Sequence, residues 1–323
     1  MKRAIPSLFL AAAAAMLAPG AVLAQQKLLI GTTSSSSSHY GYFVAVSQVI
    51  NQKAKGVNAS VVETGATLDN LRRMERKQVD MGLVTTNVMH NALAGTGSFA
   101  GKPMDGAKLL WVYSIAPQNV VIRADAGIRT LAELTGKRLN PGIKGSATEK
   151  TTEAVFKVLG VNPDYMRGST GEAVSSIKDN RIAGYVKSGA GMALDASSRE
   201  IATFTPVRII GLDAGQRQKL EKAMPELSMV DVPAVASLDI PAYATWGFGV
   251  GAAAGPDMTE ETAYQIVKAV CEDKEAQAAA FAEVKGVDLV EMTLKFATTP
   301  LHPGAVRYFR ERGAQVPARL VAQ

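Results

Sequence analysis

The chain has 323 residues, and its 35 lysines and arginines against 29 aspartates and glutamates give a formal net charge of +6 at pH 7. The charges are scattered and form no basic block interleaved with aromatic residues, which argues against a nucleic-acid-binding protein. Cys271 is the single cysteine, so an intramolecular disulfide and a cysteine-based metal cluster are excluded.

The first 24 residues have the pattern of a secretory signal peptide. Lys2 and Arg3 form a basic start, an apolar stretch runs from Leu8 to Leu17, and Val22-Leu23-Ala24 is a small-residue cleavage pattern. The apolar stretch is too short for a membrane helix, and no later segment is long and apolar enough to span a bilayer. We therefore expect 1–24 to be removed and the mature chain to be periplasmic. About 300 residues remain, which is enough for two ordinary domains.

A buried strand, a hydroxyl-rich loop and a helix start follow one another near the mature N-terminus. Leu28-Leu29-Ile30 leads through Gly31 into the hydroxyl run Thr32–Ser38, and a helix-period segment with Tyr42 and Phe43 on its apolar face comes next. The free N–H groups of a helix start favour an anion, and hydroxyl groups add donors that can rotate towards it. We interpret the run as a polar ligand-binding loop. A flexible low-complexity linker is the alternative.

The first part of the chain then continues as an α/β unit. Val57–Thr64 and Val79–Thr85 read as strands, and Thr67 is placed to cap the helix between them. This β-α-β-α-β order predicts a parallel sheet. Ligands of such sheets lie outside the carboxyl ends of the strands. The three strand ends here are small and polar, and they predict one face of a site: Gly31–Ser38, Thr64-Gly65 and Thr85-Thr86-Asn87.

A second α/β unit follows two strand-like runs that are separated by Pro117. The strand Lys137–Asn140 leads into a glycine-containing loop and then into two capping boxes, Ser146–Glu149 and Ser169–Glu172. The strand Ile182–Val186 ends in Lys187-Ser188-Gly189, so polar residues and glycines again gather at strand ends and helix starts. Two units with matching polar rims predict two lobes that face each other across a cleft.

The last third returns to a strand at Ala244–Val250 and then becomes mainly helical. The glycine pattern Gly247–Gly251 lies within that strand and opens no helix, so we do not expect a dinucleotide cofactor. The three histidines have no partner at metal-ligand spacing, which argues against zinc. We expect His302 to be structural, leave ligand contact open for His39, and leave Arg123 open between a ligand carboxylate and a salt bridge to Asp125.

A series of short motifs, taken together, resembles one family. In chain order these are Ile30-Gly31-Thr32 with Tyr40, Thr64–Leu71, Asp80–Val84, Val121–Ile128, Leu131–Arg138, Gly145–Glu149 and Pro300–Ala305. They are similar to motifs of the TAXI family, the extracytoplasmic solute receptors of tripartite ATP-independent periplasmic (TRAP) transporters. The resemblance implies a type II periplasmic-binding-protein fold that closes on an organic anion, such as a glutamate- or 2-oxoglutarate-like carboxylate, and delivers it to a membrane permease.

The chain departs from the family pattern at its predicted cleft rim and in one strand. Ser34–Ser38 replaces a glycine-rich loop, and His39 stands where the family has the first of two tyrosines. Ala183–Val186 lacks an expected acidic residue, and Lys187 follows where relatives more often have a small or hydroxyl residue. The ligand class implied by the family therefore does not transfer directly.

We therefore expect a two-lobed α/β protein of the periplasmic-binding-protein type, with mixed sheets flanked by helices. Lobe I would comprise 25–121 and 213–323 and lobe II 122–212, with hinge crossings near Gln118–Arg123 and Ile209–Asp213. The protein would be a monomeric, non-enzymatic receptor without cofactor or metal, with a small organic anion and a TRAP permease as partners and no nucleic acid. The alternatives are a ligand-sensing subunit for a membrane signalling partner and a hydrolase that uses the serine-rich loop. The predicted ligand-binding residues are Thr32, Ser34, Ser38, His39, Tyr40, Thr64, Gly65, Thr85, Thr86, Asn87, Gly145, Ser146, Thr148, Lys187 and Ser188.

Overall fold

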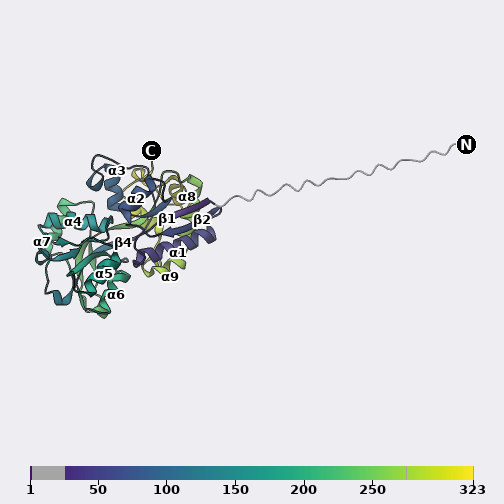
Figure 1. The fold of residues 1–323 in the computed structure, drawn as a ribbon. Helices are drawn as coiled ribbons and strands as arrows, with labels where there is room; N and C mark the ends of the chain where they lie inside the picture. The colour runs from purple at the N-terminus through teal and green to yellow at the C-terminus, as the bar shows by residue number, and fades with distance from the viewer. Residues whose placement is uncertain (2–25, 274, 323) are drawn as a thin grey trace.

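A computed structural model describes Met1 and residues 26–273 and 275–322. Apart from Met1, the predicted signal peptide lies outside the described residues. The described chain is a mixed α/β structure in which two groups of elements lie on either side of β4 (Lys108–Arg123), as Figure 1 shows. Among these residues, no helix combines the length and hydrophobicity that a membrane crossing requires.

Lobe I is built on the strand order β2-β1-β3-β10-β4. β1 (Gln26–Gly31) pairs in parallel with β2 (Val57–Val62) and with β3 (Met81–Thr85), which confirms the predicted β-α-β-α-β unit. β10 (Tyr243–Ala254) lies antiparallel to β3 and to the first part of β4. The helices of this lobe are α1 (Ser38–Lys53), α2 (Thr67–Glu75), α3 (Thr86–Ala94), α8 (Glu260–Glu272), α9 (Ala276–Ala280), α10 (Leu289–Phe296) and α11 (Pro303–Glu311).

Lobe II is built on the second part of β4 together with shorter strands. β7 (Gly184–Ser188) and β8 (Val207–Ile210) pair antiparallel to β4, and β5 (Arg138–Asn140) joins β7 to β6 (Asp164–Tyr165) through parallel pairing. Its helices are α4 (Ala147–Leu159), α5 (Thr170–Lys178), α6 (Ala196–Ala202) and α7 (Ala214–Ala223). The capping box at Ser169 is present in full. At Ser146 only half of the predicted box forms, because the carboxylate of Glu149 accepts from the Gly145 N–H and binds Arg167.

The predicted strand break at Pro117 is wrong, because β4 runs through this residue without interruption. Proline lacks an N–H group and therefore weakens a strand where that group would be needed. Pro117 lies where β4 changes partner: Lys108–Pro117 pairs with β10, and pairing with β7 begins at Gln118. Its carbonyl still accepts from the Gly189 N–H at 2.7 Å, so β4 passes from one lobe into the other as one strand.

The segment between β8 and β10 is predicted to belong to lobe I, but it also packs against lobe II. α7 packs against α4, and β9 (Ser228–Val232) pairs with Tyr243–Gly247, the first part of β10. The predicted boundaries at 121/122 and 212/213 stay predictions. This packing favours a second crossing within β10, near Gly247.

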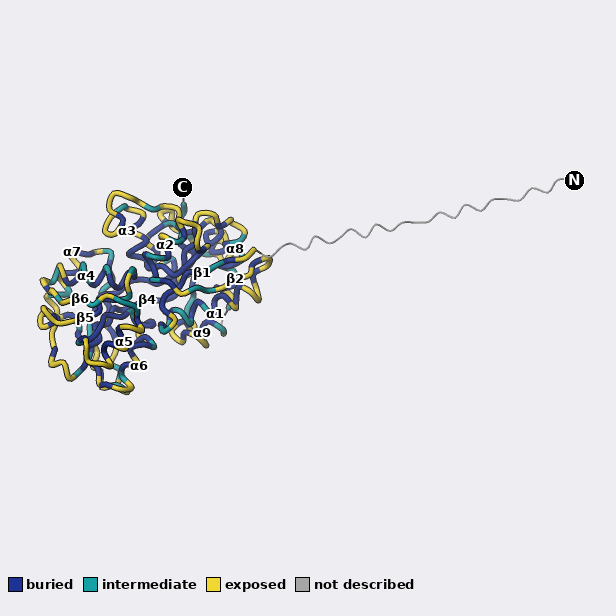
Figure 2. Tube along the Cα trace, viewed as in Figure 1, coloured by how far each residue is buried: buried dark blue, intermediate teal, exposed yellow. Residues whose placement is uncertain are grey.

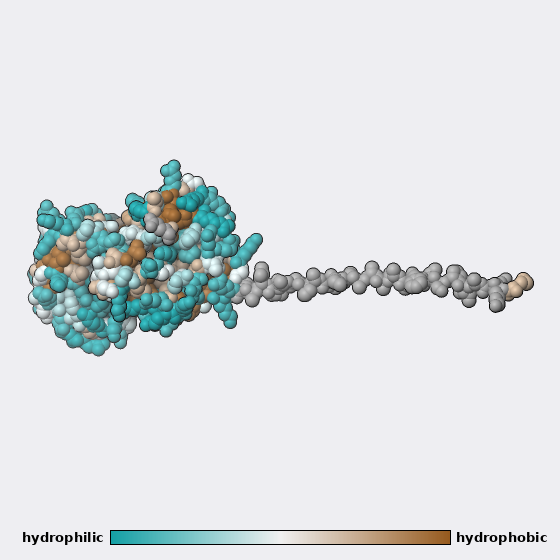
Figure 3. Space-filling model, turned by 90° about the horizontal axis from the view of Figure 1, so that it is seen from above, coloured by the Kyte–Doolittle hydropathy of each residue, from teal (hydrophilic) through white to brown (hydrophobic). Residues whose placement is uncertain are grey.

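The main core extends through both lobes beside a second, smaller cluster, and exposed residues lie at the periphery of both lobes (Figure 2). Alternate residues of β4 serve two clusters: Val120 and Ile122 belong to the main core, and Val121 belongs to a smaller cluster with residues of α5 and α6. Within 26–273 and 275–322, the exposed large apolar side chains are Leu93, Met192 and Phe204. The face drawn in Figure 3 is mostly hydrophilic, with small, separate hydrophobic patches.

Arg123 and His302 each bond to other residues of the protein. The guanidinium of Arg123 donates to both oxygens of Asp125, at 2.9 and 2.6 Å, so Arg123 forms the internal salt bridge. His302 precedes α11, where its Nδ1 accepts from the Gly304 N–H and its Nε2 lies 3.0 Å from the Met258 carbonyl oxygen. His302 is therefore a structural residue, as predicted.

Candidate functional site

A small cavity of about 40 Å³ lies between the two lobes. The loop after β1, the start of α2 and the end of β3 line it from lobe I, and the start of α4 and the end of β7 line it from lobe II. Its volume is far below the roughly 300–1,000 Å³ that is typical of sites for drug-sized ligands. In this arrangement of the lobes the cavity is therefore smaller than such a site. It lies at the carboxyl ends of the strands, where the sequence predicted the ligand.

The predicted site residues separate into two groups. The following line the cavity: His39, Thr85, Ser146, Thr148, Lys187 and Ser188. The others lie nearby but do not line it: Thr32, Ser34, Ser38, Tyr40, Thr64, Gly65, Thr86, Asn87 and Gly145. For all of them, ligand contact stays a prediction.

Most residues of the second group already have hydrogen-bond partners within the protein. Thr64 donates to the Thr32 carbonyl at 2.9 Å, Ser34 and Ser36 bond to each other at 3.0 Å, and Gly145 donates to Glu149. Asn87 lines a separate, wider groove of about 560 Å³. Its Nδ2 donates across the lobes to Thr151 Oγ1 at 3.0 Å.

The sequence analysis missed lining residues that are next to the predicted ones. These are Ala66 and Thr67, together with the apolar residues Leu83, Ile143, Ala147, Val186, Phe248 and Val250. Thr33 and Ser37 also line the cavity and lie within the predicted ligand-binding loop Thr32–Ser38. Thr67 was predicted to cap α2, but Ala66, with φ of 67°, holds the cap position and Thr67 is the first helical residue. The Thr67 hydroxyl is therefore not used as a cap.

Two hydroxyl groups at the cavity have unused hydrogen-bonding capacity. Thr67 Oγ1 and Thr85 Oγ1 are buried and have no hydrogen-bond partner within the described part of the chain. A buried polar group without a partner costs roughly 1–3 kcal/mol, so such groups need an explanation. Because both residues line the cavity, a polar ligand there would satisfy them.

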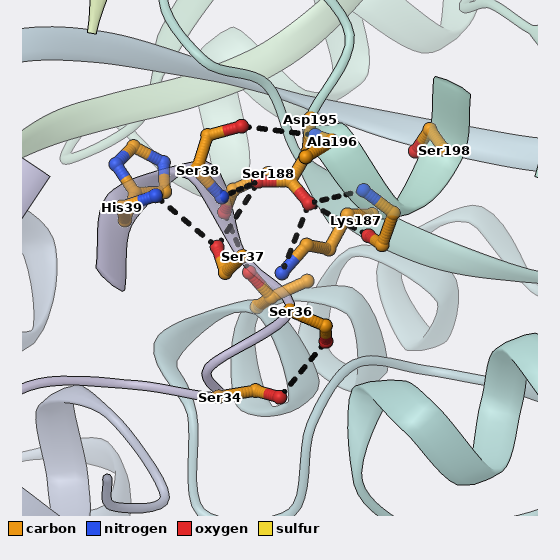
Figure 4. Close-up of polar contacts among 12 residues, drawn as sticks. Ser34, Ser36, Ser37, Ser38, His39, Lys187, Ser188, Asp195, Ala196 and Ser198 are labelled. Atoms are coloured by element: carbon orange, nitrogen blue, oxygen red, sulfur yellow. Dashed lines mark hydrogen bonds and ion pairs between the residues drawn. The ribbon is translucent and has the colours of Figure 1, made fainter. Parts of the chain in front are cut away.

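Asp195 is the main feature that sequence reasoning missed. This fully buried carboxylate caps α6 in lobe II and also accepts from Ser37 Oγ at 3.0 Å and from the Ser38 N–H at 2.9 Å, both at the start of α1 in lobe I. The Ser38 hydroxyl accepts in return from the Ala196 N–H at 2.9 Å. Figure 4 shows Ser37 and Ser38 directed at Asp195, with Lys187 close by. An aspartate before Ala196-Ser197-Ser198 is a typical helix cap, but nothing in the local sequence links it to α1.

Lys187 is buried and lies 3.7 Å from Asp195 through its Nζ atom. Burial opposes ionisation of Asp195, but the charge of Lys187 and hydrogen bonds from Ser197 outweigh it and hold the pKa of that carboxyl below its usual value. The side chain of Lys187 forms no hydrogen bond with any described residue besides this ion pair. Its ammonium group therefore has donors left for a ligand.

His39 is buried and neutral at physiological pH. Burial lowers its pKa from 6.5 to about 4. Its Nε2 lies 3.0 Å from the Gly189 carbonyl oxygen and must therefore carry the proton, which leaves Nδ1 to accept from the Tyr113 hydroxyl at 2.8 Å. Both ring nitrogens are occupied, so His39 joins the lobes through Gly189.

Ser37, His39 and Asp195 lie together but are not connected as a catalytic triad. A triad needs a histidine nitrogen that accepts the serine proton and an aspartate that orients the ring. Here the Ser37 hydroxyl donates directly to Asp195, and the histidine ring contacts neither residue through its nitrogens. Among the described residues, no cluster of histidine, cysteine, aspartate or glutamate could hold a metal ion.

Solved structures share this arrangement at low sequence identity. A candidate L-cystine ABC transporter from Listeria monocytogenes has a TM-score of 0.50 and 12% identity, over 82% of this chain and 98% of that chain. A protein from Bordetella bronchiseptica RB50 has a TM-score of 0.52 and 12% identity, over 89% and 98% of the two chains. A TRAP periplasmic solute-binding protein from Sulfitobacter sp. NAS-14.1 with bound β-D-galacturonate has a TM-score of 0.49 and 10% identity, over 89% and 96%.

These likenesses concern the fold. The two-lobed α/β arrangement is that of the type II periplasmic-binding proteins, as predicted. The model of the NMT1-like family matches residues 30–313, which is most of the sequence. This chain therefore belongs to the NMT1-like family.

Proposed function

We propose that this protein is a non-enzymatic, periplasmic solute receptor that closes on a small organic anion and delivers it to a TRAP membrane permease. The observation that carries the proposal is the inter-lobe cavity, where the ammonium group of Lys187 and the hydroxyls of Thr67 and Thr85 have unused donors. A carboxylate accepts hydrogen bonds of this kind at both of its oxygens. The solute-binding protein from Sulfitobacter illustrates a TRAP receptor with a bound sugar acid.

The assignment to the TAXI family and to a TRAP system rests on the sequence motifs, and export rests on the N-terminal signal pattern. A hydrolase is the weaker alternative, because both nitrogens of His39 are engaged away from Ser37. A sensor subunit would have the same binding site and would differ only in its membrane partner.

A thermal-shift screen of mono- and dicarboxylates on the purified mature chain tests the binding step. We expect at least one acid to raise the melting temperature, since a ligand that binds only the folded state stabilises it by RT ln(1 + [L]/Kd). Mass spectrometry of small molecules released from natively purified protein provides an independent identification. Hydrolysis of esters or amides without stabilisation by any anion would instead support the hydrolase.

Uptake of the identified acid by cells distinguishes transport from sensing. Deletion of the gene should abolish high-affinity uptake if the protein serves a permease. Retained uptake together with a lost transcriptional response would support the sensor.

A further inference from the structure

Lys187 and Asp195 form a buried pair whose charges cancel, but the two side chains differ in what they can still bind. The Asp195 carboxylate accepts from Ser37 Oγ, the Ser38 N–H and both the N–H and the hydroxyl of Ser197, at 2.6 to 3.1 Å. It has contacts at both oxygens. Lys187 has three N–H donors and only the 3.7 Å ion pair. The pair is therefore electrically neutral, yet only its positive member can take a ligand.

No other cation is available at this site. Lys187 is the one lysine or arginine among the described residues that line the cavity, and His39 is neutral. The Ser38 N–H at the start of α1, which could have held an anion, is already bonded to Asp195. The other polar side chains that line the cavity are uncharged, and the rest of its lining side chains are apolar.

These facts limit the charge of a ligand. One carboxylate of a ligand can bind to Lys187, and the uncharged polar atoms next to it in the ligand can bond to the hydroxyls of Thr67 and Thr85. A second carboxylate in the same small cavity would find no cation and would add its charge to that of Asp195, and like charges held together in a buried site strongly disfavour ionisation.

Resting on the proposed function, we propose that Asp195 is a specificity-determining residue that restricts the ligand to molecules with a single carboxylate and excludes dicarboxylates. The substrate class is therefore a small monocarboxylate with a polar, uncharged substituent. 2-Oxoglutarate, a dicarboxylate, would be rejected.

Succinate and succinamate test this directly, because they have the same size and differ only in the exchange of one carboxylate for an amide. Calorimetry at pH 7.5 and constant ionic strength should give a dissociation constant at least tenfold lower for succinamate with the wild-type protein. L-Lactate and 2-oxoglutarate extend the comparison to smaller and larger acids.

Asp195→Asn removes the negative charge and keeps one acceptor oxygen, so either the Ser38 N–H or the Ser197 N–H loses its acceptor. We expect this variant to reduce the preference for succinamate by tenfold or more. Asp213→Asn is the matched control: Asp213 also caps a helix, α7, but is exposed and away from the cavity. Its preference should equal that of the wild type.

The outcomes separate the two proposals. Equal binding of succinate and succinamate by the wild type, or an unchanged preference in Asp195→Asn, overturns the inference while the receptor function stands. If Asp195→Asn does not fold, the wild-type ratio alone decides whether dicarboxylates are disfavoured. If neither succinamate, succinate, L-lactate nor 2-oxoglutarate binds the wild type or either variant, the proposed carboxylate receptor fails, and the inference fails with it.

Discussion

At the scale of single residues, His39 makes the stability of the protein depend on pH. Its pKa is lowered to about 4 in the folded chain by burial, against 6.5 when it is exposed. Between these values the unfolded chain binds a proton that the folded chain does not, so folding stability is lost as the pH falls through this range. The proton linkage predicts a loss of about 2 kcal/mol between pH 7 and pH 5 from this residue alone.

Urea unfolding of the wild type and of His39→Gln at these two pH values measures this contribution. The wild type should lose about 2 kcal/mol more than His39→Gln on acidification. His90→Gln is the control, because His90 is exposed, and it should follow the wild type. Equal losses in the wild type and His39→Gln would contradict a buried, neutral His39.

Lys187 is expected to provide most of the binding energy for a carboxylate. A hydrogen bond to a charged group contributes roughly 1.5–3 kcal/mol, so Lys187→Met should weaken monocarboxylate binding about ten- to a hundred-fold. Methionine keeps the length of the side chain without the ammonium group.

Because Lys187→Met leaves Asp195 without its ion-pair partner, it should also lower the stability of the protein. The double variant Lys187→Met/Asp195→Asn should recover stability but not affinity. Calorimetry and urea unfolding read the two effects separately, and unchanged affinity in Lys187→Met would place the ammonium outside the site.

At the scale of elements, close packing of α11 against α8 depends on Gly304. A Cβ atom at this position would lie 2.4 Å from the Glu260 carbonyl oxygen and 2.5 Å from the Tyr264 nitrogen, both backbone atoms of α8. Gly304→Ala must therefore push the two helices apart, and overpacking of this kind costs about 1–3 kcal/mol. Gly41→Ala in α1 is the matched control, since nothing lies within 4 Å of its Cβ position. It should stabilise the protein by about 0.5–1 kcal/mol, because alanine favours a helix. Thermal unfolding of both variants measures whether Gly304→Ala lowers the melting temperature and Gly41→Ala raises it.

The local pattern of the sequence was enough to predict these elements but not how they meet. The strands of lobe I, the helix starts and the polar strand ends follow from periodicity and capping residues, which act over a few positions. Pro117 predicts a break because it lacks an N–H group. The sequence does not show that β4 changes its pairing partner at this residue. Asp195 was missed for a related reason: its contact with Ser38 joins residues 157 positions apart, and only the tertiary structure brings them together.

At the scale of the whole molecule, the lobes are held together by hydrogen bonds that an open form would lose. Ser38 N–H donates to Asp195, His39 donates to the Gly189 carbonyl, and Asn87 donates to Thr151 Oγ1, and each of these bonds joins lobe I to lobe II. Ligand binding that draws the lobes together should reduce the radius of gyration in small-angle X-ray scattering. An unchanged radius at saturating ligand would indicate a rigid pocket.

Neighbouring threonines of α4 offer a sharper test of closure, because one bridges the lobes and the other does not. Thr151 Oγ1 accepts from Asn87 in lobe I, whereas Thr152 Oγ1 is buried without a partner in the described chain. Thr151→Val keeps the shape of the side chain and removes an inter-lobe bond worth about 0.5–1.5 kcal/mol, so it should shift the unliganded protein towards the open form and weaken ligand binding about 2- to 10-fold. Neither residue lines the cavity, so the change acts on closure and not on ligand contact. Thr152→Val should leave affinity and radius unchanged. Calorimetry and scattering on both variants decide the point: equal behaviour of the two would mean that the bond between α3 and α4 does not contribute to closure.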